Sequence, residues 1–405
     1  MSNSALSHRF EVLDSLRGLA ALVVVVGHCL NLLPEIPWVE YSPMHNARSA
    51  VIFFFILSGF VLALPFSNSR GVHYPSYLVK RIFRIYSPYL CAVALAVLAY
   101  ELLSRGGVPE LGAWFNSIWV TPLTVRLLVD HVLLIGSFQN HVYNPVLWSL
   151  VHEMRISLVF PFICSWIMRQ DWRIGLGVGL AASIVGAVLS YTTSVLLNWQ
   201  NDYFETIHYL FMFIVGILLA KHRTQLIQAL APLRRFALLM IFGLGLVLFT
   251  YGKGVHVILK NERFLYLDDW VISLGAALVL LTVMASKDLS KALTITPLRI
   301  LGEISYSLYL FHAIILFSLA YLLHGSLPTG VILGLAILVS IVVSYLAWRW
   351  IEQPSITLGR RFSSYLKPQP ARETAIMVPS TSALSRSAPP STGMHEDRVG
   401  KPRWG

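Results

Sequence analysis

The sequence is poor in charged residues, which make up only 13% of its 405 residues, against about 25% in an average globular domain. Hydrophobic residues make up 56%, and the mean hydropathy is +0.66. A soluble domain of this composition would have too few polar side chains to cover its surface. Composition therefore excludes a soluble enzyme, a disordered chain and a fibrous protein, and it predicts a polytopic membrane protein.

Cysteine is also scarce, with three residues, Cys29, Cys91 and Cys164, all inside apolar stretches. Their number and spacing exclude a disulfide framework and a cysteine-based metal site. We therefore expect them to be small buried hydrophobic residues, and we expect no bound metal.

Long apolar runs are abundant, and a bilayer-spanning helix needs about 20 largely apolar residues. Ten runs qualify: 13–33, 49–66, 86–103, 147–168, 174–197, 203–220, 236–251, 268–286, 300–323 and 329–350. The sequence thus predicts an all-α integral membrane protein with a bundle of about ten transmembrane helices. The segment 127–138 is too short and too polar to span, so we expect an interfacial or re-entrant helix there.

The net charge of +11 is distributed like that of a membrane protein, and we expect no nucleic-acid partner. Loops after the even-numbered spans hold 13 Lys and Arg residues, against 6 in loops after the odd-numbered spans. Because basic loops stay on the cytoplasmic side, both termini are predicted to be cytoplasmic. The expected location is the plasma membrane, which in bacteria is the inner membrane.

The last part of the chain differs in composition from the rest. Residues 355–405 are rich in Ser, Pro, Arg and Thr and lack apolar periodicity. We therefore expect a transmembrane domain over 1–354 and a disordered, basic cytoplasmic tail over 355–405.

Ionisable residues inside a membrane are costly and are therefore candidates for function. Arg17 and His28 are eleven residues apart in the first span, which places them on one helix face about 16 Å apart. Pairing of Arg17 with Asp14, and a purely structural hydrogen bond for His28, are the alternatives.

Glu153 is the next intramembrane charge. Counting residues from the helix ends puts Glu153 and His28 at similar depths, so we expect Glu153 to orient the His28 imidazole. Pairing of Glu153 with Arg155 or His152 remains open.

Three further residues are expected to line a pocket. Tyr309 and His312 belong to a polar stripe in the ninth span, and Ser58 interrupts the apolar run FFFILSGF. The alternatives are a structural role for His312 and close helix packing at Ser58 and Gly59.

Arg81 and Arg84 lie one helical turn apart in the run KRIFRIYSP. Two guanidinium groups on one face suit phosphate groups, which accept bidentate hydrogen bonds. Simple anchoring on the basic side of the membrane is the alternative.

These residues resemble the motifs of the acyltransferase type 3 family of ten-span membrane acyltransferases. The matching motifs are Arg17 followed by His28, FFILSGF over 54–60, Arg81 and Arg84 with Ile85 and Pro88, Trp148–Leu150 followed by Glu153, Tyr306 with Tyr309, Leu310 and His312, and WIEQP over 350–354. Nothing beyond Pro354 is expected to form the extracytoplasmic hydrolase-like domain that many members carry.

The resemblance implies transfer of an acyl group, usually acetyl, from cytoplasmic acyl-CoA to a hydroxyl of a glycan or glycolipid. It implies acetyl-CoA as a donor substrate and no permanently bound cofactor. It also implies that His28 is the essential histidine and that Arg17, Arg81 and Arg84 serve the donor. Surface polysaccharide, lipopolysaccharide and exopolysaccharide are among the acceptors it suggests.

A secondary transporter is the alternative function, because transporters also carry His, Glu and Arg residues near the membrane midplane. Inverted repeats or two interrupted helices would favour a transporter, and the sequence shows neither clearly.

Overall fold

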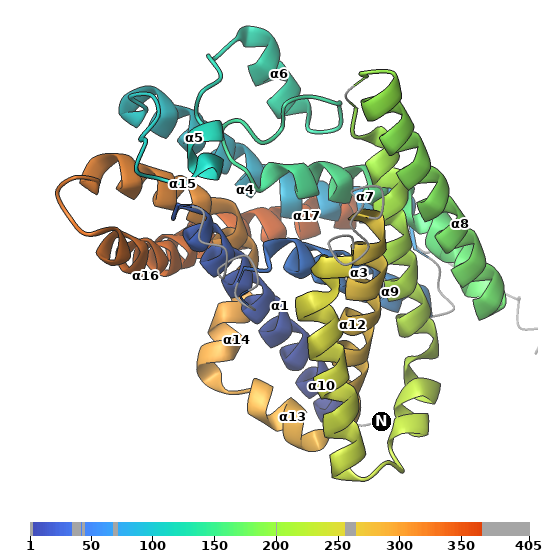
Figure 1. Ribbon diagram of the computed structural model, residues 1–405. Coiled ribbons are helices and arrows are strands. Elements are labelled where there is room, and N and C mark those ends of the chain that lie inside the picture. The colour runs from blue at the N-terminus through green and yellow to red at the C-terminus, as the bar shows by residue number, and fades with distance from the viewer. Residues whose placement is uncertain are drawn as a thin grey trace, which may run out of the picture. The chain divides into compact units, whose positions relative to one another are not determined.

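The computed structural model describes residues 3–34, 42, 45–67, 72–199, 201–255 and 265–366, and every regular element within them is helical (Figure 1). The helices are α1 (Asn3–Asn31), α3 (Ala47–Ala63), η1 (Leu64–Ser67), α4 (Tyr74–Leu103), α5 (Ala113–Ser117), α6 (Val125–Leu133), α7 (Leu147–Arg169), α8 (Trp172–Tyr191), η2 (Thr192–Leu196), α9 (Tyr203–Leu230), α10 (Arg235–Tyr251), η3 (Gly252–Gly254), α12 (Leu265–Ala285), α13 (Lys287–Leu293), α14 (Thr296–Glu303), α15 (Ser305–Leu323), α16 (Thr329–Ala347), η5 (Trp348–Glu352) and α17 (Gln353–Tyr365).

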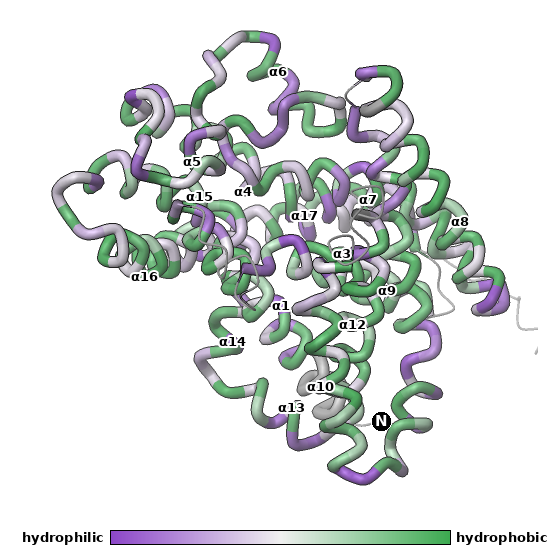
Figure 2. Tube along the Cα trace, viewed as in Figure 1, coloured by the Kyte–Doolittle hydropathy of each residue, from purple (hydrophilic) through white to green (hydrophobic). Residues whose placement is uncertain are grey.

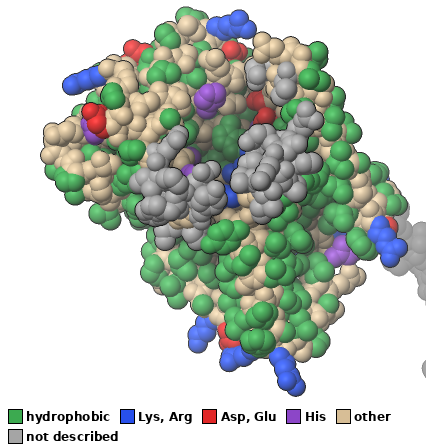
Figure 3. All heavy atoms as spheres, in the orientation of Figure 1, with side chains coloured by type: hydrophobic (Ala, Val, Ile, Leu, Met, Phe, Trp, Pro, Cys, Tyr) green, Lys and Arg blue, Asp and Glu red, His purple; other side chains and the backbone are tan. Residues whose placement is uncertain are grey.

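Ten helices in the described part of the chain are long and apolar enough to cross a membrane. This confirms the predicted all-α integral membrane bundle. Figure 2 shows apolar colouring along α8, α10 and α12, with polar residues concentrated at their ends. On the face shown in Figure 3, apolar side chains cover much of the surface over α10, and charged side chains lie mainly at the edges.

Two helices are longer than the apolar runs that predict them. α4 begins at Tyr74 rather than at residue 86, and its polar first part buries Ser76, Arg81 and Ile85 against the rest of the protein. The tenth span continues through the π-helical turn η5 into α17. The predicted run 300–323 is divided, since α14 ends at Glu303 and α15 begins at Ser305.

The domain boundary expected at residue 354 is wrong, because α17 extends the folded region to Tyr365. Its Phe362 ring stacks on Phe83 of α4 with ring centroids 5.5 Å apart, and Ser76 donates a hydrogen bond to the Ser363 carbonyl (3.0 Å). The rest of the expected tail, residues 367–405, lies outside the described residues.

The segment expected to form an interfacial or re-entrant helix contains α6. Its outward face carries Val125, Val129 and Leu133, all exposed, while Leu127 and His131 on the other face are buried. α6 is too short to span a bilayer and is amphipathic. The helix is confirmed, and its place at the membrane interface stays a prediction.

The three cysteines do not share one environment. Cys29 and Cys164 are buried as expected, whereas Cys91 is exposed on the outer face of α4. The expectation of burial is wrong for Cys91. An exposed position within a spanning helix faces lipid, where a thiol behaves as a small hydrophobic group.

Small residues bring α3 and α9 into close contact at the centre of the bundle. A Cβ atom added at Gly216 would lie 2.6 Å from the Phe60 nitrogen, and one added at Gly59 would lie 2.8 Å from the Phe213 Cα. Glycine on both helices permits this approach, as expected for Gly59 in the FFFILSGF run.

We predict that Gly216→Ala destabilises the protein by about 1–3 kcal/mol, because α3 and α9 must separate to admit one methyl group. The measurement is the thermal unfolding midpoint of the purified protein in detergent. Gly177→Ala on α8 is the matched control, since a Cβ there meets nothing within 4 Å. An equal midpoint for the two variants would contradict the close packing.

Candidate active site

A cavity of about 800 Å³ lies among α1, α3, α4, α7 and α15, within the usual size range of ligand pockets, roughly 300–1,000 Å³. Its lining includes six residues that the sequence analysis singled out: Arg17, Ser58, Arg81, Arg84, Glu153 and Tyr309. Its exposed lining residues are Val61, Pro65, His73, Lys80 and Arg360, and the last three form the polar part of its mouth.

Arg81 is the most firmly held cation of this cavity. It is buried, forms an ion pair with Glu153, and donates from Nε to the Ser157 hydroxyl (2.9 Å). Ser58 donates to the same carboxylate oxygen of Glu153, Oε1, at 3.1 Å. Glu153 is largely shielded from solvent, with 18% of its side chain exposed, and a shielded carboxylate needs such partners because an isolated buried charge is costly.

The structure therefore corrects the expected partner of Glu153. Its hydrogen bonds go to Arg81 and Ser58 and, among the described residues, none goes to His28, Arg155 or His152. Similar depth did not make His28 the partner, because residue counting says nothing of the direction in which a side chain points. α4 is 30 residues long and carries Arg81 up to Glu153.

Arg17 and Arg84 are the less restrained cations of the cavity. Arg17 forms an i, i+3 ion pair with Asp14 at 3.2 Å, the pairing considered above. No carboxylate among the described residues lies within 4 Å of Arg84, although the charges of Arg17 and Glu352 act on it. The Arg84 guanidinium is thus available to a ligand.

Glu352 of the WIEQP run is a buried carboxylate near Arg84 that the sequence analysis did not identify as a candidate residue. It is buried, accepts a hydrogen bond from Ser307 (2.7 Å), and interacts electrostatically with Arg84. A carboxylate within an otherwise apolar run could have marked Glu352 as a candidate residue. Lys80 and Arg360 at the mouth were also not identified as candidate residues. Arg360 lies in the segment that was expected to be disordered.

α15 supplies three hydroxyl groups to the cavity. Tyr306 donates to the Ile85 carbonyl (2.8 Å), and the Tyr309 hydroxyl lies 2.6 Å from the Ser149 Oγ. The Ser305 hydroxyl is buried and has no hydrogen-bond partner among the described residues. A buried hydroxyl without a partner is costly, so Ser305 can contribute a hydrogen bond to a ligand.

His28 lies outside the lining of this cavity, near the end of α1. Its Nδ1 is 2.9 Å from His312 Nε2, so the two imidazoles meet edge to edge with ring centroids 5.1 Å apart, and the Trp114 ring stacks on His28 with centroids 5.0 Å apart. His312 is absent from the lining of this cavity and contacts His28 instead, so its expected role in substrate binding stays a prediction. Trp114 on α5 was missed, since nothing in its local sequence points to α1.

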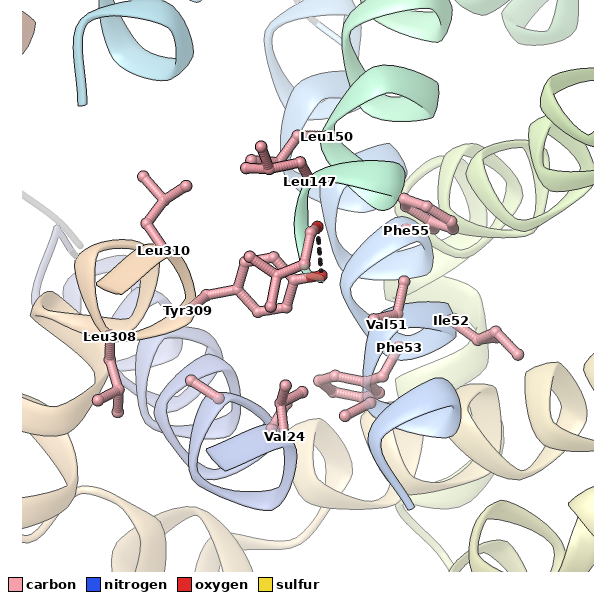
Figure 4. Close-up of a cluster of buried hydrophobic side chains, with 14 of the residues drawn as sticks. Val24, Val51, Ile52, Phe53, Phe55, Leu147, Leu150, Leu308, Tyr309 and Leu310 are labelled. Carbon is pink, nitrogen blue, oxygen red and sulfur yellow. Dashed lines mark hydrogen bonds between the residues drawn. The ribbon is translucent and has the colours of Figure 1, made fainter. Parts of the chain in front are cut away.

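Tyr309 stands between the cavity and the two histidines. It lines the cavity, and its ring centroid is 6.3 Å from that of His312. Figure 4 shows Tyr309 projecting from α15 towards Leu147 and Leu150 of α7. On α1 the lining stops at Arg17, so the cavity follows α3, α4, α7 and α15 rather than the α1 face between Arg17 and His28.

A second group of buried charges joins α3, α9 and α12. Asp269 is fully buried and accepts two hydrogen bonds of 2.8 Å from Arg48 and one of 3.1 Å from His208. Sequence reasoning missed it, although an aspartate within the eighth span was a usable signal. It lines neither described cavity, and it ties three helices together.

We predict that Asp269→Ala destabilises the protein by about 3–5 kcal/mol, because it leaves Arg48 without its partner in the bundle. Asp288→Ala is the matched control, since it breaks an exposed ion pair with Arg235, a type worth about 0–1 kcal/mol. Thermal unfolding in detergent compares the two variants. Equal losses would show that Asp269 is no structural tie.

The described residues contain no group of three or more His, Cys, Asp or Glu side chains that would hold a metal ion. The groups suited to a ligand are instead cations at the cavity mouth, hydroxyls along its wall and an imidazole pair beyond Tyr309. This arrangement suits an anionic ligand with a long neutral arm.

Comparison with known proteins gives one family and several relatives. The model of the family described as "Acyltransferase domain" matches residues 10–349. "O-acetyltransferase OatA" of Staphylococcus aureus is 23% identical over 411 residues, which cover 92% of this chain and 62% of that protein. "Putative membrane-bound transacylase BcsY" of Komagataeibacter xylinus is 25% identical over 375 residues, covering 87% and 85%.

"Peptidoglycan O-acetyltransferase OatA" of Listeria monocytogenes is 23% identical over 380 residues, covering 88% of this chain and 57% of that protein. The chain thus spans about three fifths of the length of the OatA relatives. No solved structure matches the chain.

Proposed function

Because the chain belongs to the acyltransferase type 3 family, we propose that it is a membrane O-acyltransferase that uses acyl-CoA, most simply acetyl-CoA, as its donor. The proposed acceptor is a hydroxyl of a carbohydrate, as in a surface polysaccharide or glycolipid. The choice of acyl-CoA as the donor rests on the cavity, which Arg17, Arg81 and Arg84 line together with apolar and hydroxyl-bearing side chains.

Coenzyme A fits the chemistry of this cavity from end to end. Its phosphates suit guanidinium groups, which bind phosphate oxygens by paired hydrogen bonds. Its pantetheine arm is long and largely uncharged, with amides that match the Ser305 hydroxyl. Lys80 and Arg360 at the mouth add positive charge where the nucleotide end would enter.

The proposed orientation follows from the same residues. Lys80, Arg81 and Arg84 belong to the basic segment that the positive-inside rule assigns to the cytoplasm, where acyl-CoA is made. The termini are then cytoplasmic, and His28 near the far end of α1 lies towards the opposite side. This is the geometry of a transferase that takes its donor from one side and its acceptor from the other.

In the proposed reaction, His28 is the general base. It removes the proton of the acceptor hydroxyl as the oxygen attacks the thioester carbonyl. The new C–O ester bond forms, the C–S bond breaks, and the coenzyme A thiolate takes the proton from the His28 imidazolium. The thioester must pass Tyr309 to reach His28, so Ser58 and Tyr309 guide the arm. A transient acyl-histidine is the alternative role for His28.

Glu153 has a different role in this proposal from the one first expected. It holds Arg81 at the donor cavity through their ion pair and does not orient His28. The catalytic constellation is therefore divided between a donor group, Arg17, Arg81, Arg84 and Glu153, and a reaction group, His28 and His312.

The proposal is tested by placing the purified protein in liposomes with acetyl-CoA labelled in its acetyl group and a bacterial surface glycan fraction. The expected result is base-labile label on the glycan that depends on the protein. Accumulation of glycan or anions across the membrane without ester formation would favour a secondary transporter instead. Absence of both transfer and thioester hydrolysis would contradict the enzyme.

A further inference from the structure

The two histidines form a hydrogen-bonded chain that ends on the backbone. His28 Nδ1 lies 2.9 Å from His312 Nε2, and His312 Nδ1 lies 2.9 Å from the Leu308 carbonyl oxygen. Each of these two hydrogen bonds holds one proton between two atoms, so the protonation states of the nitrogens in the two imidazoles depend on one another. Fixing one of them fixes the others.

The Leu308 end of the chain is unambiguous. A carbonyl oxygen only accepts hydrogen bonds, so His312 Nδ1 carries a proton and donates it to Leu308. If His312 is neutral, its Nε2 has no proton and acts as the acceptor. His28 Nδ1 must then carry the proton that joins the two rings.

The surroundings favour a neutral His312. Its side chain is 1% exposed, and no carboxylate among the described residues lies within ion-pair distance of either histidine. An unpaired charge in such a place is costly. The hydrogen bonds from Leu308 through His312 therefore leave a lone pair on His28 Nε2. This nitrogen has no hydrogen-bond partner among the described residues.

We propose that His312 is a positioning residue that, through the Leu308 carbonyl, holds His28 as its Nδ1–H tautomer, so that His28 Nε2 is the atom that removes the acceptor proton. The inference rests on the proposed function for the identity of that proton. A neutral imidazole in water prefers the proton on Nε2, so the protein selects the less common tautomer and presents the basic nitrogen to the acceptor.

The same arrangement stabilises the charged state of His28. When Nε2 takes up the proton, His28 Nδ1–H still donates to His312 Nε2 and the hydrogen bond becomes charge-assisted. The Trp114 ring stacks on His28 at 5.0 Å, within the reach of a cation–π interaction, about 6 Å. The imidazolium formed during the reaction thus meets two favourable partners without any rearrangement.

The direct test is the tautomer of His28 itself, read from ¹⁵N chemical shifts of the histidine-labelled protein in detergent without substrates. The His28 signals are assigned by their loss in His28→Gln. We expect Nδ1 protonated and Nε2 unprotonated in the parent and in His312→Gln, whose amide oxygen accepts the same hydrogen bond. In His312→Leu the Nε2–H form should become the major tautomer.

Kinetics supply the second readout. His312→Leu is expected to lower kcat by about 10²-fold or more with the KM for acyl-CoA within about threefold, because KM reports donor binding in the cavity. His312→Gln should retain activity within about tenfold of the parent. Loss of activity in His312→Gln equal to that in His312→Leu would overturn the positioning role.

Failure of this inference and failure of the proposed function give different results. An Nε2–H tautomer in the parent overturns the inference even if acyl transfer is observed. The Nδ1–H tautomer in a protein that transfers no acyl group supports the assigned tautomer and overturns the enzyme. The spectrum of the parent decides the tautomer even if His312→Leu does not fold.

Discussion

His28→Ala is expected to lower the turnover of acyl transfer by about 10²–10⁴-fold, the usual contribution of a general base. The substitution removes the one imidazole that bonds to His312 and stacks on Trp114. The hydrogen bond and ring contacts that His28 makes among the described residues involve no residue of the cavity lining, so donor binding should persist. Turnover and KM for acyl-CoA, measured on purified protein, separate the two effects.

Two variants accompany this measurement. His28→Gln keeps most of the volume and a donor for the His312 hydrogen bond, so it should fold like the parent and remain inactive. His222→Ala, on α9 away from the cavity, should retain full turnover. Activity near that of the parent in both His28 variants would remove His28 from the mechanism.

Arg84→Ala is expected to raise the KM for acyl-CoA by about 10- to 100-fold with a smaller effect on kcat. One hydrogen bond to a charged group contributes about 1.5–3 kcal/mol, and Arg84 has no carboxylate partner within 4 Å among the described residues. Arg81 is the poorer choice for this test, because its removal leaves Glu153 without its cation. Initial rates against acyl-CoA concentration give both constants.

Lysine at position 84 should restore only part of the affinity, because an ammonium lacks the planar fork of a guanidinium. Arg173→Ala is the control, since Arg173 is an exposed cation on α8 that lines no described cavity. If a double variant lacking Arg17 and Arg84 binds coenzyme A as the parent does, these arginines are topology anchors only.

The helices were predictable from sequence because a span needs a long apolar run, and such runs are visible residue by residue. The Arg17–Asp14 pair was predictable for a related reason, since residues three apart share a helix face. The approximate place of α6 also followed from its short, mixed sequence. Local rules sufficed wherever the partners lie within one helix.

Contacts between distant helices were not predictable in this way. His28 and His312 are 284 residues apart, and no spacing within one helix reports that they meet. Glu153 was assigned to the wrong partner because residue counting gives depth but not tilt or direction. Arg81 reaches it only because α4 starts twelve residues earlier than its apolar run indicates.

The tail boundary failed for a compositional reason. The Ser- and Arg-rich sequence of α17 resembles a disordered segment, yet Gly359 lets the helix lie close to Phe83 of α4. α17 is nevertheless amphipathic, and packing of one such face against a neighbour supplies most of a helix's stability. Arg360 was lost from the list of candidate residues with it.

Photolabelling tests whether an acyl-CoA occupies the arginine-lined cavity. A coenzyme A thioester with a photoreactive acyl chain is bound to the purified protein, irradiated, and the labelled peptides are identified by mass spectrometry. We predict labels on the cavity walls, at 54–58 of α3 and 305–309 of α15, that excess coenzyme A prevents and that weaken in Arg84→Ala. Labels confined to the outward faces of α8 and α10, or unaffected by coenzyme A, would show that acyl-CoA does not bind in this cavity.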